Sequence, residues 1–178
     1  QHFSDGQGGF YDTADDAAPL ISRPRDPSDN AEPSGWFAVA NACVTYSAIT
    51  GVIEYRDIAE RALGIVLTLA GRAPRAVGWG LATATALLAG PLEVAVVGDE
   101  DDRAWSVMRR NALMATSPGA VVAVGQAGAD VVPLLRDRPL MDGRATAYVC
   151  RHFVCEAPTT DPTELAVRVG TRRALLEE

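Results

Sequence analysis

The spacing of hydrophobic residues predicts helices in the first half of this chain. Between residues 54 and 70, apolar side chains recur at alternating steps of three and four, the period of a helix with one buried face. Residues 35–49 are rich in alanine and other apolar side chains, and residues 75–89 repeat the helical period despite Gly78 and Gly80. The faces expected to be buried are Tyr55, Ile58, Ala62, Ile65 and Leu69 in the second helix and Val77, Leu81, Ala84 and Leu88 in the third.

The pattern changes at Pro91, where short apolar runs predict buried strands. The three runs are residues 92–98, 120–125 and 145–150. Residues 101–115 between the first two runs predict a helix that buries Trp105, Met108 and Ala112. A strand, a helix and a strand with short links are typical of a parallel βαβ unit.

Acidic residues mark two helix starts. Asp161 fits an N-cap, Pro162 the first helical position, and Glu164 the reach-back position of a capping box. The turn Val97–Glu100, which follows a predicted strand and contains Gly98, hints at a nucleotide-binding turn, and residues 99–102 are all acidic. The sequence lacks the G-x-G-x-x-G fingerprint, and these charges would repel a phosphate, so helix capping is favoured.

Residues 8–35 form a charge-dense segment, which we call the acidic excursion. Two short extended segments, residues 9–13 and 19–23, predict a hairpin-like fold, and the prolines and glycine of residues 24–35 predict a loop. One interpretation is a solvated loop whose Asp and Asn side chains cap turns and helices. The other is sugar chemistry, which needs one carboxyl group as acid and another as base or nucleophile. The candidate catalytic residues are Asp12, Asp15, Asp26 and Asp29, and the candidate substrate-binding residues are Arg23, Arg25, Asn30, Glu32 and Ser34.

The charge balance excludes several functions. A net charge of −7 argues against binding to nucleic acid or to an anionic membrane. The chain contains no lysine, which excludes lysine-based Schiff-base catalysis. No apolar run is long enough for a membrane helix and no signal peptide is visible, so a cytoplasmic location is expected. Because Gln1 runs directly into a patterned segment, the chain is expected to be a piece of a longer protein.

Cys150 and Cys155 are a possible thiol pair with His152 between them. A structural zinc site needs four ligands, and few other candidate ligands remain, so neither a metal site nor a cofactor is expected. The spacing is also not the C-x-x-C of a redox centre. Two buried, reduced thiols are the simplest interpretation, and a disulfide or a regulated thiol pair is the alternative.

Three segments resemble the C-terminal part of the thioredoxin-domain-containing YyaL / spermatogenesis-associated protein family. They run from Gly8 to Asp16, from Arg23 to Gly35, and from Ala145 to Pro162, and their order and spacing follow the family across the chain. One departure is Trp36, which stands where relatives usually have asparagine after Pro-Ser-Gly.

The resemblance implies an α+β fold. Residues 1–90 would be the end of an (α/α)6 barrel like that of six-hairpin glycosidases, comprising its last helices and the hairpin excursion. Residues 91–178 would be a small α/β unit with a short, mainly parallel sheet. The expected partners are the remainder of the same protein, including a thioredoxin-like domain, or a second copy of the chain. A sugar is the expected ligand at the barrel mouth, and the alternative is a non-catalytic scaffold for the redox domain.

Overall fold

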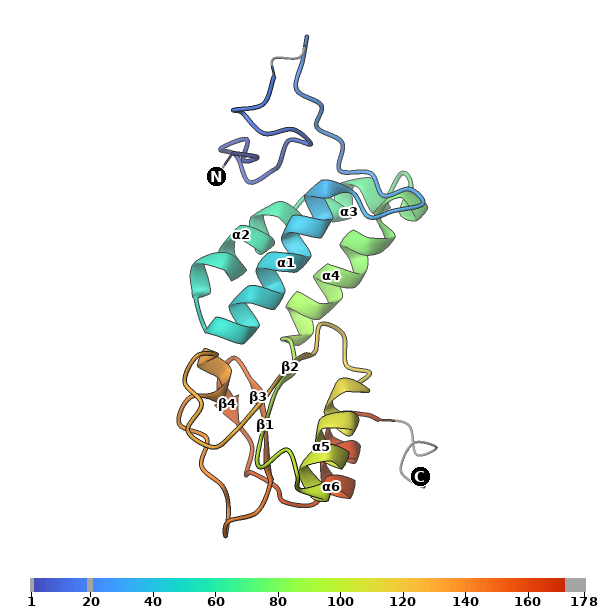
Figure 1. Ribbon diagram of the computed structural model, residues 1–178. Helices are drawn as coiled ribbons and strands as arrows, with labels where there is room; N and C mark the ends of the chain where they lie inside the picture. The colour runs from blue at the N-terminus through green and yellow to red at the C-terminus, as the bar shows by residue number, and fades with distance from the viewer. Residues whose placement is uncertain (1, 19–20, 172–178) are drawn as a thin grey trace. The chain divides into compact units, whose positions relative to one another are not determined.

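The computed structural model describes residues 2–18 and 21–171, which form two compact units. The first unit comprises Gln1–Val44 and Ile53–Leu88, and the second comprises Thr45–Val52 and Ala89–Glu178. In the first unit, helices follow a stretch that ends at residue 34 and has no helix in its described residues, and a four-stranded sheet with helices forms most of the second unit (Figure 1). This mixed content confirms the α+β class.

All three predicted helical regions of the first half are present. The elements are α1 (Gly35–Thr50), α2 (Ile53–Leu63), α3 (Val66–Ala70), the 3₁₀ turn η1 (Pro74–Val77) and α4 (Gly78–Ala89). The single helix expected over residues 54–70 is divided at Gly64, whose N–H bonds the Arg61 carbonyl in a tight turn. These helices do not by themselves close a barrel, so the origin of the unit in an (α/α)6 barrel stays a prediction.

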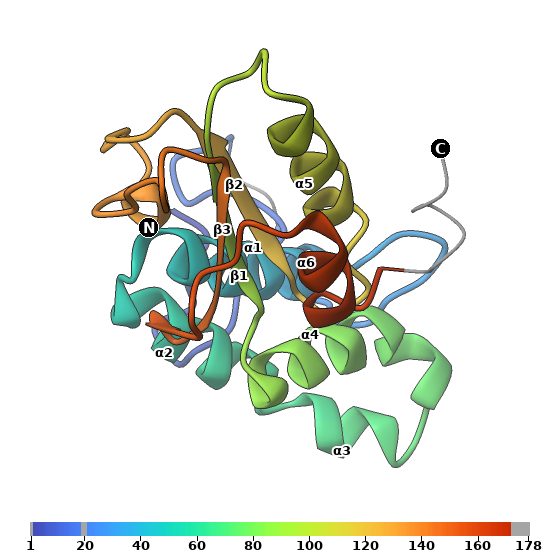
Figure 2. The same cartoon turned by 90° about the horizontal axis from the view of Figure 1, so that it is seen from below.

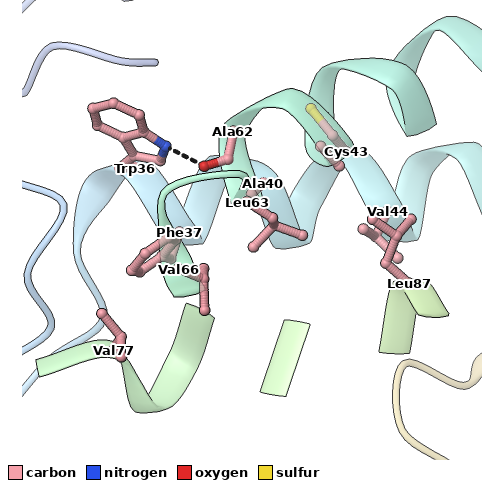
Figure 3. Close-up of a cluster of buried hydrophobic side chains, with 11 residues drawn as sticks. Trp36, Phe37, Ala40, Cys43, Val44, Ala62, Leu63, Val66, Val77 and Leu87 are labelled. Carbon is pink, nitrogen blue, oxygen red and sulfur yellow. Dashed lines mark hydrogen bonds between the residues drawn. The ribbon is translucent and has the colours of Figure 1, made fainter. Parts of the chain in front are cut away.

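The core of the first unit forms around the start of α1 (Figure 3). Phe37 has no exposed surface, and its ring lies against Gly80 of α4. Trp36 is 5% exposed, and its indole N–H donates to the Ala62 carbonyl of α2 at 2.8 Å. An indole buried in this way has its N–H hydrogen-bonded inside the core, so Trp36 is a packing residue of the first unit.

The buried face of α4 differs from the predicted one. Leu81 and Leu88 are exposed, at 37% and 87%, while Gly80, Thr83 and Leu87 are buried. The physical reason is the Phe37 ring, which a Cβ at residue 80 would approach to 2.7 Å. Close packing on an aromatic ring therefore selects a glycine, a residue that carries no apolar signal in the sequence pattern.

The sheet of the second unit is mixed, not mainly parallel. Its strands are β1 (Glu93–Val97), β2 (Val121–Gly125), β3 (Thr146–Arg151) and β4 (Val154–Cys155), in the order β2-β1-β3-β4. The β1–β2 pair is parallel, as predicted, whereas β3 is antiparallel to both β1 and β4. Residues 126–145 include only the short turn η2 (Pro133–Leu135) and no crossover helix, so β3 starts at the edge where β2 ends.

Two helices cover one face of this sheet. Figure 2 shows α5 (Arg103–Leu113) beside α6 (Pro162–Arg168), and α5 buries Trp105, Met108 and Ala112 as predicted. The predicted caps are present, since Asp102 accepts from the Ala104 N–H and Asp161 accepts from the Thr163 N–H, each at 2.8 Å. Glu164 departs from the capping box, because its carboxylate bonds the Thr159 hydroxyl and Arg168.

Glu93 is buried within the central strand, at 2% exposure. Burial raises the pKa of its carboxyl, and the N–H bond from Phe153 and the charges of His152 and Arg138 offset this only in part. The folded chain therefore retains this proton to a higher pH than the unfolded chain. Stability should fall as the pH rises above the ordinary value of 4.5 and level off above the folded pKa.

We expect Glu93→Gln to remove this decline, because glutamine carries no charge yet still accepts from the Phe153 N–H. Urea unfolding between weakly acidic and neutral pH measures the effect. A decline that persists unchanged in the glutamine variant would contradict this role for Glu93.

Candidate functional site

The acidic excursion folds without the predicted strand pair. Over the described residues, the backbone makes an isolated bridge between Ser4 and Phe10, and the Asp12 N–H donates to the Pro24 carbonyl at 3.0 Å. This last bond joins the two arms of the excursion. Residues 19–20 lie outside the described part of the chain, so the predicted segment 19–23 is described only in part.

Asp5, a carboxylate absent from the predicted set, precedes the excursion in the sequence and binds to it. The Asp5 side chain is 3% exposed and accepts from the Gln7 and Gly9 N–H groups at 2.8 Å each. It also pairs with Arg25 at 2.7 Å. Burial raises the pKa of Asp5, but these bonds and the Arg25 charge outweigh burial and hold that pKa below its ordinary value. Asp5 is therefore ionised. We call the group that it joins by these bonds, Gln7, Gly9 and Arg25 together with Asp5 itself, the brace.

The brace packs on the helical core through Trp36. A Cβ at Gly9 would lie 2.2 Å from the Trp36 ring and 2.5 Å from an Asp5 carboxylate oxygen. The Phe10 ring meets Trp36 edge-on at 6.5 Å between centroids, and the Arg25 guanidinium lies 5.4 Å from the Trp36 ring centroid. The excursion is thus tied to α1 by an aromatic and cationic stack.

Asp29 caps a helix far away in the sequence. One of its carboxylate oxygens accepts from the Trp79 N–H at 2.7 Å and the Gly80 N–H at 3.3 Å, in the first turn of α4. The other oxygen accepts from the Ser34 N–H at 2.9 Å. Negative charge at a helix N-terminus is stabilising, so this candidate catalytic residue has a structural role in the described chain.

We expect Asp29→Ala to lower the free energy of unfolding by about 2 kcal/mol, because three backbone N–H groups lose their acceptor. Asp26→Ala is the matched control: that exposed carboxylate bonds the Ser28 N–H within its own turn, and its loss should cost about 0.5 kcal/mol or less. Urea unfolding of both variants compares them. Equal losses would contradict the capping role of Asp29.

Ser34 is the second cap in this segment. Its side chain is buried, and its hydroxyl accepts from the Phe37 N–H at 3.2 Å at the start of α1. Asn30 and Glu32 are exposed in the loop, where the Asn30 N–H donates to the Glu32 carbonyl. Of these three candidate binding residues, Ser34 is therefore used by the fold, while the side chains of the other two face solvent.

Asp12 and Asp26 are brought together at the surface. A carboxylate oxygen of Asp12 accepts from the Asp26 N–H at 3.3 Å, and both residues are exposed. The bonds from Ser28 hold the pKa of Asp26 below its ordinary value, which keeps this carboxyl ionised at neutral pH. The two side chains are therefore suited to accepting hydrogen bonds, and Asp26 is unsuited to donating a proton.

His2 lies beside Asp15, the remaining candidate aspartate, and beside its neighbour Asp16. Its Nδ1 atom lies 2.7 Å from Asp15 and 3.7 Å from Asp16, and all three side chains are exposed. The bond from His2 lowers the pKa of Asp15. The ligand atoms lie within 4.8 Å of one another, close enough to share a metal ion, although an exposed ion pair alone accounts for the approach.

Arg23 holds the loop that carries these aspartates. Its guanidinium donates to the carbonyls of His2 at 3.0 Å and Thr13 at 2.6 Å. The same group lies 4.0 Å from the centroid of the Tyr11 ring. Arg23, a candidate substrate clamp, thus binds the backbone of its own excursion.

Cys150 and Cys155 form a disulfide, with sulfurs 2.08 Å apart. The two reduced thiols favoured by the sequence are therefore not what the structure contains. The residues face each other across the β3–β4 hairpin, and β4 is only two residues long. The disulfide is the alternative that the sequence left open, and a strand of that length has no detectable alternation from which β4 could be predicted. Cys43 is a buried free cysteine in the first unit.

Comparison with known proteins gives one distant relative. The chain is 26% identical to human spermatogenesis-associated protein 20 over 170 residues, which cover 92% of this chain and 22% of the relative. The chain therefore spans about a fifth of the length of that protein. No protein-family model matches the chain, and no solved structure matches it. In the described residues, no helix has the length and apolar character needed to cross a membrane. The similarity supports the family resemblance, while the thioredoxin-like domain and the barrel remain predictions.

Proposed function

We propose that this segment is a non-catalytic structural module of a longer protein, docked through apolar helix faces against another part of that protein. The observation that carries the proposal is the composition of α1 and α4. Neither helix contains a charged residue, although each has solvent-exposed positions. A solvent-facing helix usually carries charged residues on its outer face, so the absence of charge supports a further partner for these helices.

The exposed apolar side chains of the first unit point to the same role. Leu88 of α4 is 87% exposed, Leu67 of α3 is 81% exposed, and Trp79 is 45% exposed. Exposed apolar groups of this size on one helical unit support an interaction role for it. The relative's much greater length gives such a partner a source within the same polypeptide.

The hydrogen bonds and ion pairs made by the aspartates of this region favour a structural role over a catalytic one. Asp5, Asp15 and Asp26 all have lowered pKa values, and Asp29 is engaged as a cap. Glycoside hydrolysis needs a carboxyl group that remains protonated until it donates to the leaving group. The lowered pKa values make Asp15 and Asp26 poor general acids.

A binding experiment tests the docking proposal. The polypeptide that precedes this segment in the longer protein is expressed separately and titrated with the chain in a calorimeter. We expect association that Leu67→Glu and Leu88→Glu each weaken by at least about tenfold, because a buried apolar contact becomes a charge. Val131→Glu is the control, since Val131 is 91% exposed in a loop of the second unit.

Sedimentation of the chain alone shows whether it associates with itself or remains a monomer. Self-association that the same leucine variants abolish would identify a second copy of the chain as the partner. A monomer that melts cooperatively and binds neither itself nor the preceding polypeptide would overturn the proposal.

A carbohydrate-binding site on the excursion is the second candidate function. It is favoured by one observation, the exposed Asp12 and Asp26 pair in a segment that also presents the partly exposed Arg25. Glycan-array screening followed by calorimetry tests it. Binding that Asp12→Asn and Asp26→Asn abolish, without loss of stability, would support a sugar site. Absence of binding to any glycan by the longer protein would exclude it.

A further inference from the structure

The Cys150–Cys155 disulfide lies in an unusually small hairpin of the second unit. The two cysteines are register partners in the β3–β4 pair, and only Arg151 and Val154 extend that pairing. β4 is one of the two edge strands of the sheet, and Val154 is 76% exposed. The disulfide is thus the main covalent restraint on a short strand with few hydrogen bonds of its own.

The two sulfurs have different surroundings. Cys150 is 2% exposed, whereas Cys155 is partly exposed. A guanidinium nitrogen of Arg138 lies 3.7 Å from the Cys150 sulfur. Arg138 is held there by a contact with the Leu134 carbonyl at 3.5 Å and by the Tyr148 ring, 5.0 Å away. A positive charge stabilises a thiolate, so Cys150 has the better environment for a leaving sulfur and Cys155 the better access for attack.

The turn between the strands is held in an unfavourable conformation. His152 has a φ of 52° and Phe153 a φ of 60°, the left-handed region that favours glycine. Space for the two rings comes from glycines: Cβ atoms at Gly90 and Gly51 would lie 2.7 Å from the His152 ring and 3.2 Å from the Phe153 ring. Such a conformation persists only where surrounding contacts enforce it.

A buried carboxylate supplies one of those contacts. The Phe153 N–H donates to Glu93 at 2.7 Å, and Glu93 is buried in the central strand. The disulfide, the two glycine contacts and this hydrogen bond therefore all restrain the same four-residue turn. Loss of the covalent restraint would favour relaxation of the turn and would bring water to Glu93.

We infer that the Cys150–Cys155 disulfide is a thiol–disulfide exchange site that a dithiol reductant opens through Cys155. A thiolate of the reductant attacks the Cys155 sulfur, the Cys150–Cys155 bond breaks, and Cys150 leaves as a thiolate beside Arg138. The second thiol of the reductant then attacks the reductant's own sulfur and releases Cys155. Two electrons pass to the protein, two protons complete the Cys150 and Cys155 thiols, and the reductant becomes a cyclic disulfide.

Opening the disulfide releases β4 and the turn and exposes the Glu93 carboxylate. This device lies in the second unit and depends on neither function proposed for the first unit. Cys43 does not compete, because it is buried and burial raises the pKa of its thiol.

Trapping with a monothiol tests the direction of attack. The oxidised chain is treated with glutathione under native conditions, quenched with acid and mapped by peptide mass spectrometry. We expect glutathione mainly on Cys155, by about fivefold or more over Cys150, since attack follows access. Equal labelling, or labelling mainly of Cys150, would overturn the proposed direction.

Reduction kinetics with dithiothreitol test the part played by Arg138. We expect Arg138→Gln to slow opening by about fivefold and Arg138→Lys to restore most of the rate, because lysine retains the charge beside the leaving sulfur. Arg136→Gln is the matched control, since the Arg136 guanidinium contacts the Asp130 carbonyl at 3.5 Å. An unchanged rate in Arg138→Gln would refute this role, and equal slowing by Arg136→Gln would show a merely structural effect.

Hydrogen exchange tests the consequence of opening. On reduction, and in the Cys150→Ser/Cys155→Ser variant, the amides of Phe153 and Glu156, which donate to Glu93 and to the Val149 carbonyl, should exchange about tenfold faster, while β1 and β2 remain protected. A disulfide that dithiothreitol reduces only in denaturant would overturn the inference. Unchanged exchange at Phe153 after complete reduction would also overturn it.

Discussion

Replacing Gly9 by alanine should destabilise the first unit by about 3 kcal/mol, because no small shift relieves the overlap. The added methyl would lie 2.2 Å from the Trp36 ring and 2.5 Å from the Asp5 carboxylate. Trp36 is fixed by its bond to the Ala62 carbonyl, and Asp5 by the Gln7 N–H and by Arg25. Urea unfolding followed by tryptophan fluorescence measures the loss.

Gly78→Ala is the control for this prediction. A Cβ there meets nothing within 4 Å, and φ is −59°, a value that alanine adopts readily in a helix. Gly78→Ala should leave the free energy of unfolding unchanged or raise it by up to about 1 kcal/mol. If Gly9→Ala changed the free energy of unfolding as little as Gly78→Ala, the excursion would not be packed tightly against Trp36. That result would remove the main argument against an open site there.

Periodicity predicted the elements that are either buried throughout or buried along one face. The apolar run at residues 92–98 became the fully buried β1, and the predicted face of α5 is the observed one. Periodicity did not predict the division of α2 from α3 at Gly64 or the antiparallel direction of β3. Both depend on tertiary packing and on the path of the connecting chain, which leave no periodic signal.

The roles within the excursion depend on contacts that are distant in sequence. Asp29 was a candidate catalytic residue because of charge density, yet its carboxylate caps a helix that begins about 50 residues later. Asp5 lies outside the excursion and so was not singled out, although its buried carboxylate joins the other residues of the brace. The one available clue was the position of Asp5 four residues before Gly9, because its carboxylate accepts a hydrogen bond from the Gly9 N–H. A charged loop therefore does not reveal which carboxylates are engaged by the fold.

Phe37→Ala should cost about 4 kcal/mol, because it empties the centre of the first core. Phe37 has no exposed surface, and its ring lies against Gly80 across the α1–α4 contact. Gly80→Ala alone should cost about 2 kcal/mol, since its Cβ would lie 2.7 Å from that ring. Urea unfolding of the four proteins of a double-mutant cycle measures the coupling between the two residues.

In the Phe37→Ala background, Gly80→Ala should instead stabilise by up to about 1 kcal/mol, because the clash is gone and alanine favours the helix. The coupling between the two sites is then about 3 kcal/mol in magnitude. Phe37→Leu replaces Phe37→Ala if the latter fails to fold, and the sign of the coupling stays the same. Additive losses would show that residue 80 does not contact the Phe37 ring, and the close α1–α4 packing described for this unit would be wrong.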